Sequence, residues 1–143
     1  MTMPVWMLLG FATWTVLLLL FTVGTYRWSR ILTARAQISE FKADRVEGED
    51  WYKRAMRAHA NCIENLPVFA AVVLALFVSG TGGPLVDYLS VSVLGTRIAQ
   101  SLVHVSFVQS DRVVAVRFGF FCVQAFSFLV LAGLIAHTAG FTS

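Results

Sequence analysis

The stretch RAMRAHANCIENLP, Arg54–Pro67, runs directly into VFAAVVLALFVSG, residues 68–80, and the two halves differ sharply in polarity. The second half has no charged side chain, which is typical of a membrane-spanning helix. In the first half four polar residues are spaced three, four and three positions apart, so on one helix they fall within about 80° of arc. These four residues are Arg54, Arg57, Asn61 and Glu64. Because charged groups at membrane depth turn toward protein or water, the stretch predicts one membrane helix with a polar inward face.

The composition of the whole chain also indicates a membrane protein. Charged residues make up 13% of the 143 residues, and hydrophobic residues make up 57%. A soluble domain typically has about a quarter charged residues. We therefore expect one all-α domain over residues 1–143, an antiparallel bundle of four transmembrane helices with a polar loop at about 29–50. The expected spans are about 3–28, 51–79, 85–110 and 112–137.

The basic residues predict how the bundle is oriented. Eight of the eleven Lys and Arg residues precede or open the second span: Arg27, Arg30, Arg35, Lys42, Arg45, Lys53, Arg54 and Arg57. Because basic loops stay in the cytoplasm, we expect both termini on the non-cytoplasmic side of a multi-pass membrane protein, in the inner membrane if the source is a bacterium. Acidic residues are interleaved with the basic ones, so the pattern does not favour nucleic-acid binding.

A second polar stripe is expected on the third helix. Arg97, Gln100, Ser101 and His104 share one helical face. Helices two and three are joined by SGTGGP, residues 79–84, and must run antiparallel. At about 1.5 Å per residue, Glu64 and Arg97 lie at similar depth, which predicts an ion pair between them. The stripes either hold the helices together as polar contacts or line a cavity whose positive charge suits an anionic ligand.

The motif in the opening stretch resembles the signature of the MAPEG family, the membrane-associated proteins of eicosanoid and glutathione metabolism. The matching residues are Arg54, Arg57, Ala58, His59, Asn61, Glu64 and Pro67. The number of spans, the polar first loop and an arginine inside the third helix are similar as well. The resemblance therefore extends over nearly the whole chain.

The resemblance implies a homotrimer that binds glutathione as co-substrate in a cytoplasm-facing cleft between subunits. A lipophilic small-molecule substrate would arrive from the lipid bilayer. The glutathione-binding residues implied by motif position are Arg54, Arg57, Asn61, Glu64, Arg97, His104 and, from the neighbouring subunit, Arg35. Arg112 is the first candidate for stabilising the glutathione thiolate, and Arg117 is the second. A nearby guanidinium lowers the pKa of a thiol, so either arginine would raise the population of the nucleophile.

Two positions depart from the family pattern. His104 and Asn65 stand where members with known activity usually have tyrosine. The main prediction is a membrane-bound glutathione transferase or peroxidase. A non-enzymatic, trimeric lipid-binding or scaffold protein on the same fold is an alternative, and a small four-span transporter is a weaker one. Cys62 and Cys122 lie outside any metal-ligand spacing, so we expect no metal site.

Overall fold

The computed structural model describes residues 1–41 and 46–141 and is built from four long antiparallel helices. The first consists of α1 (Met3–Leu18), a π-helical turn (Leu19–Gly24) and α2 (Thr25–Leu32), which follow one another without a break. It is followed by a short 3-10 turn at Ile38–Glu40, then α3 (Asp50–Ser79), α4 (Pro84–Ser106) and α5 (Asp111–Phe141). Lys42, Asp44 and Arg45 of the expected polar loop lie outside the described residues.

Three of the long helices are long and apolar enough to cross a membrane: Met3–Leu32, Asp50–Ser79 and Asp111–Gly140. The remaining helix, α4, has 23 residues, or about 34 Å of helix, which is also a spanning length. It is more polar than the others because it carries Arg97, Gln100, Ser101 and His104, all of which are buried inside the bundle. The bundle itself agrees with the expected fold, and the crossing of α4 stays a prediction.

The helix boundaries differ from the expected spans in three places. The first helix continues to Leu32 instead of ending near residue 28, and α5 reaches Phe141 instead of 137. The third expected span ends early, at Ser106, because Phe107 has an extended backbone. Ser110 then accepts a hydrogen bond from the backbone N–H of Val113 at 3.4 Å, which caps the start of α5.

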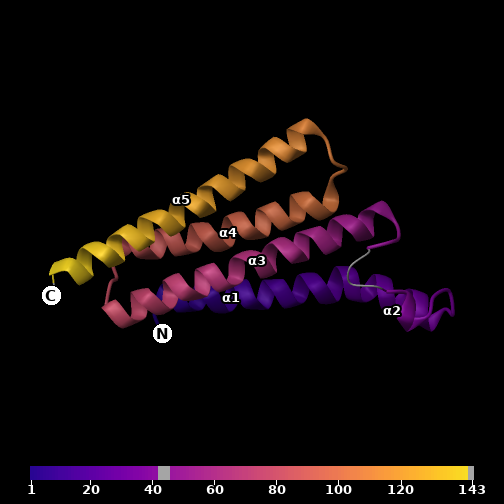
Figure 1. Ribbon diagram of the computed structural model, residues 1–143, viewed down its shortest axis with the longest axis horizontal. Helices are drawn as coiled ribbons and strands as arrows, with labels where there is room; N and C mark the ends of the chain where they lie inside the picture. The colour runs from indigo at the N-terminus through magenta and orange to yellow at the C-terminus, as the bar shows by residue number, and fades with distance from the viewer. Residues whose placement is uncertain (42–45, 142–143) are drawn as a thin grey trace.

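The turn between α3 and α4 follows directly from its glycines and proline. Gly80 takes a left-handed conformation with φ of 66°, which ends α3, and the N–H of Thr81 bonds back to the carbonyl of Leu76 at 3.1 Å. Pro84 is the first residue of α4, where its missing N–H costs nothing. In Figure 1 this turn lies at the same end of the bundle as both termini, opposite α2 and the connection between α4 and α5.

The helices pack through a core of buried side chains from α1, α3 and α4. This core consists of Phe11, Leu18, Ala58, Cys62, Phe69, Val73 and Val93. Near the α2 end, the Tyr26 and Tyr52 rings stack at 4.2 Å, and Arg27 Nε donates to the Tyr52 hydroxyl at 2.8 Å. These contacts hold the first helix against the opening turns of α3, where the polar stripe begins.

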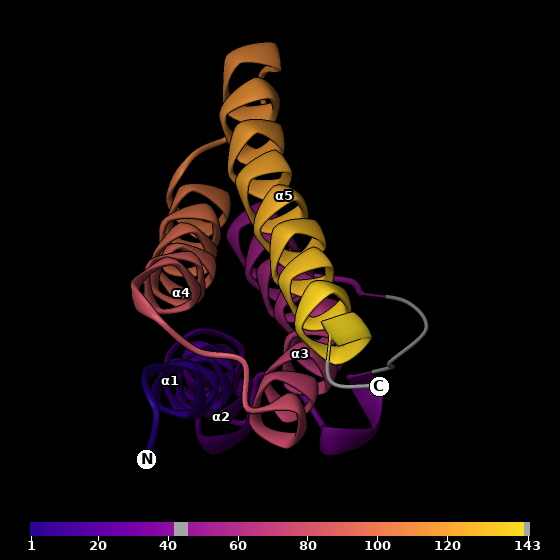
Figure 2. The same ribbon diagram turned by 90° about the vertical axis from the view of Figure 1, so that its left-hand side faces the viewer.

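The last helix is attached to the bundle along only part of its length. In Figures 1 and 2 the first turns of α5 lie away from the other helices, and its later turns run across α3 and α4. No side chain from Asp111 to Val123 is buried, and Gln124 is the first buried residue of α5. The opening half of α5 is therefore less closely packed in the single chain than the half that begins at Gln124.

Candidate functional site

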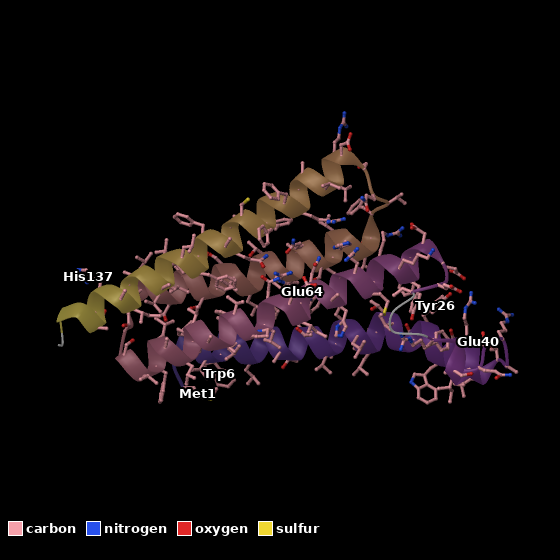
Figure 3. The ribbon with its side chains drawn as sticks, in the orientation of Figure 1. Met1, Trp6, Tyr26, Glu40, Glu64 and His137 are labelled. Atoms are coloured by element: carbon pink, nitrogen blue, oxygen red, sulfur yellow. The ribbon has the colours of Figure 1, made fainter. Side chains whose placement is uncertain are left out.

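The polar residues of α3 lie on the side of the helix that is not packed into the core. Tyr52, Ala55, Ala58 and Cys62 are buried, whereas Arg57 and Glu64 are exposed and Asn61 is half-buried. Glu64 lies about midway along α3 (Figure 3). The helical spacing read from the sequence thus places the motif on one accessible face.

Arg54 links α3 to the end of α4. Its guanidinium pairs with Asp50, one turn earlier on α3, and its Nε donates to the carbonyl oxygen of Val105 at 3.4 Å. Asn61 makes the next contact along the helix, because its Nδ2 lies 3.5 Å from Nδ1 of His104. These two contacts set the spacing between α3 and α4 at this end of the bundle.

Between α3 and α4, at this end of the bundle, lies a hollow of about 490 Å³. It is lined by Val46, Asp50, Lys53, Arg54, Met56, Arg57, Ala60, His104 and Gln109. Three of these side chains are basic and one is acidic, so the hollow attracts anions. Arginines in such a place bind carboxylates through paired hydrogen bonds.

A smaller hollow of about 200 Å³ lies between α3, α4 and the opening half of α5. Its walls are Asn61, Gln100, Val114, Arg117, Phe118 and Phe121. Asn61 lines this hollow and its partner His104 lines the larger one, so the two hollows adjoin at the Asn61–His104 contact. The smaller hollow thus has amide side chains on α3 and α4, and one guanidinium together with two phenylalanine rings on α5.

Arg97 is buried and makes its side-chain hydrogen bond to α5. It is 1% exposed, its Nη2 donates to Gln124 Oε1, and its guanidinium lies 5.6 Å above the Phe11 ring. The expected ion pair between Glu64 and Arg97 is therefore wrong: within the described part of the chain, the ion pairs are Arg30–Glu49 and Arg54–Asp50.

The rotation of α3 explains why this pair does not form. Cys62 is buried against α4, with its Sγ 3.4 Å from the hydroxyl oxygen of Ser101. Glu64 is two residues further on, about 200° around the helix, and is exposed. Glu64 is therefore exposed on α3, while Arg97 is buried and hydrogen-bonded to Gln124 of α5.

Four expected site residues line neither hollow: Arg35, Glu64, Arg97 and Arg112. Arg35 lines a separate hollow of about 520 Å³ beside Tyr26, Arg30 and Glu49. Arg112 is exposed at the start of α5. Arg117, the second candidate, lines the smaller hollow.

Sequence reasoning missed Gln124. It is buried, it accepts from Arg97, and its Nε2 donates to Gln100 Oε1 at 3.1 Å. A lone glutamine in the uncharged part of α5 that follows Arg117 was the only signal, and it gave no partner. Asn65, which departs from the family pattern, donates to the carbonyl oxygen of Asn61 on its own helix at 2.9 Å.

The comparisons with known proteins support one family. The family model described as "MAPEG family" matches residues 5–137, which include most of all four long helices and both hollows. This match confirms the resemblance predicted from the motif at Arg54–Pro67. Neither a curated protein nor a solved structure matches the chain.

Proposed function

Because the chain belongs to the MAPEG family, we propose that it is a membrane-bound glutathione transferase or peroxidase acting on lipophilic electrophiles. The observation that carries this proposal is the pair of adjoining hollows, one basic and one with an aromatic wall. A tripeptide with two carboxylates and a thiol needs a cationic site and, next to it, a place where the sulfur meets an apolar substrate. The arrangement supplies both within one subunit.

Each side chain has a role that follows from its place. Arg57 is exposed, lines the basic hollow and pairs with no acidic residue in the described part of the chain, so it is the residue best placed to bind a glutathione carboxylate. Asn61 and His104, at the junction of the hollows, offer hydrogen bonds to the peptide groups. Arg117 faces the smaller hollow, where its guanidinium would stabilise the thiolate that attacks the electrophile.

The proposed assembly is a homotrimer. The opening half of α5 exposes apolar side chains such as Val114, Phe118 and Phe121, which neighbouring subunits or lipid would cover. Arg35 and Arg57 line different hollows, so in the proposed trimer Arg35 would act on a neighbour's glutathione. Glu64 and Arg112, both exposed in the single chain, would likewise face the subunit interface.

A non-enzymatic lipid-binding role on the same fold remains the second candidate. Asn65 favours it, because its amide bonds to its own helix and cannot replace the hydroxyl of a tyrosine in the site. Glutathione binding separates the two candidates, because the lipid-binding role does not need it.

We expect the purified protein in detergent to bind glutathione, and Arg57→Ala to weaken that binding roughly 10- to 100-fold. The reason is the loss of a charge-assisted hydrogen bond, worth about 1.5–3 kcal/mol. Isothermal titration calorimetry measures both affinities. Arg30→Ala is the matched control, since Arg30 pairs with Glu49 outside the basic hollow. No glutathione binding by the unmodified protein would refute the proposed function.

We also expect both termini to lie on the non-cytoplasmic side of the membrane. They share one end of the bundle, and the basic residues of α2 and of the first turns of α3 gather near the other. A membrane-impermeant thiol reagent applied to intact cells should label a cysteine tag at the C-terminus in a Cys122→Ser variant. If the tag is labelled only after cell lysis, the C-terminus is cytoplasmic and the predicted orientation is wrong.

A further inference from the structure

Gln124 occupies the point at which α5 joins the bundle. It is the first buried side chain of α5, and its own side chain is 0% exposed. Arg117 lies about two turns earlier on the helix, and its backbone carbonyl accepts a hydrogen bond from Gln100 of α4 at 3.0 Å. A small change at Gln124 would therefore move Arg117 relative to the residues of α3 and α4.

A chain of three hydrogen bonds runs from Arg97 to Arg117 through Gln124. Arg97 Nη2 donates to Gln124 Oε1, Gln124 Nε2 donates to Gln100 Oε1 at 3.1 Å, and Gln100 Nε2 donates to the backbone carbonyl of Arg117 at 3.0 Å. The chain crosses between α4 and α5 three times. It ties the backbone of Arg117 to a buried residue deep in the bundle.

The direction of this chain is fixed at its first member. A guanidinium can only donate, so Gln124 must turn its oxygen toward Arg97 and its NH₂ toward Gln100. Gln100 must then present its own oxygen to Gln124, which leaves its NH₂ for the carbonyl of Arg117. Each amide orientation follows from the one before it.

We propose that Gln124 is a positioning residue that holds Arg117 over the smaller hollow by orienting Gln100. This inference rests on the proposed function where it concerns the glutathione thiolate. The placement of α5 that it describes is independent of glutathione.

Two substitutions separate positioning from structural support. Gln124→Leu removes the whole chain. Gln124→Glu keeps an acceptor for Arg97 and adds a counter-charge, but it has no donor for Gln100. Gln100 would then turn its NH₂ toward the new carboxylate and its oxygen toward the carbonyl of Arg117, where two acceptors repel. Ser127→Ala is the control, because Ser127 is buried on the same helix and donates only to Val123 of that helix.

We expect Gln124→Glu to unfold at the same temperature as the unmodified protein or above it. Its thiolate absorbance at saturating glutathione, and its kcat with a generic aromatic electrophile, should fall about tenfold, as misplacement of a catalytic group predicts. KM for glutathione should change little, since the basic hollow is untouched. Gln124→Leu should lose the same activity and also stability, and Ser127→Ala should lose neither.

Amide hydrogen exchange of residues 111–121 tests the placement of α5 without glutathione. Exchange should be faster in both Gln124 variants than in the unmodified protein and Ser127→Ala, and unchanged in α1. Unaltered exchange in Gln124→Glu, or full thiolate absorbance in that variant, would overturn the inference. If the unmodified protein shows no thiolate, the proposed function fails, and the exchange comparison alone decides whether Gln124 positions α5.

Discussion

Replacing Arg117 by alanine should lower kcat about 100-fold and remove most of the glutathione thiolate at neutral pH. A thiol of this type is mostly protonated at pH 7, and only a nearby positive charge makes the nucleophile abundant. Loss of one preorganised charge-stabilising donor in an active site typically costs a hundredfold or more. Arg117 is the guanidinium of the smaller hollow, and the measurement is thiolate absorbance together with steady-state kinetics.

Arg112→Ala is the matched comparison for this prediction, because it removes the same charge from the same helix five residues earlier. Arg112 is exposed in the single chain and lines neither hollow, so its loss should change the thiolate little. The opposite result, with Arg117→Ala active and Arg112→Ala inactive, would mean that the thiolate lies at a subunit interface and meets the arginine of a neighbour. Arg117→Lys should recover part of the rate, since it keeps the charge but not the planar pair of donors.

The long helices were predictable from the sequence because apolar runs and turn residues determine them locally. The glycines and proline of SGTGGP end α3 and begin α4 where expected. The ends of the helices were less predictable. Leu32 and Ser106 are not marked by glycine or proline, and the end of α4 depends on the extended backbone at Phe107.

The polar face of α3 was predictable for the same local reason, but the partners of its residues were not. Helical spacing gives the angle between Arg57, Asn61 and Glu64, whereas the rotation of the whole helix is set by packing of Cys62 and its buried neighbours. A depth estimate therefore placed Glu64 level with Arg97 without showing that Arg97 faces Gln124. Which side chains meet across two helices depends on tertiary packing, and a single sequence contains no direct signal for it.

The largest expected loss of stability comes from Phe69→Ala, because Phe69 joins three helices. Its ring is 0% exposed and lies 5.9 Å from the ring of Phe11 on α1 and 6.0 Å from that of Phe128 on α5. Removing it leaves a cavity that these neighbours cannot fill. We expect a loss of about 3 kcal/mol in the free energy of unfolding, the low end for a buried phenylalanine, because in a bilayer packing and not water exclusion holds helices together.

Phe77→Ala is the control for this prediction, since it makes the same change on the same helix at a side chain that is 70% exposed. Its effect should stay within about 0.5 kcal/mol, the usual range for a surface position. Reversible unfolding in mixed micelles, followed by circular dichroism, measures both variants. Because Phe128 lies one helical turn beyond Gln124, a loosened contact with Phe69 should also speed amide exchange in the opening half of α5. Equal losses from Phe69→Ala and Phe77→Ala would show that Phe69 does not hold these helices together, and that another contact sets the angle at which α5 leaves the bundle.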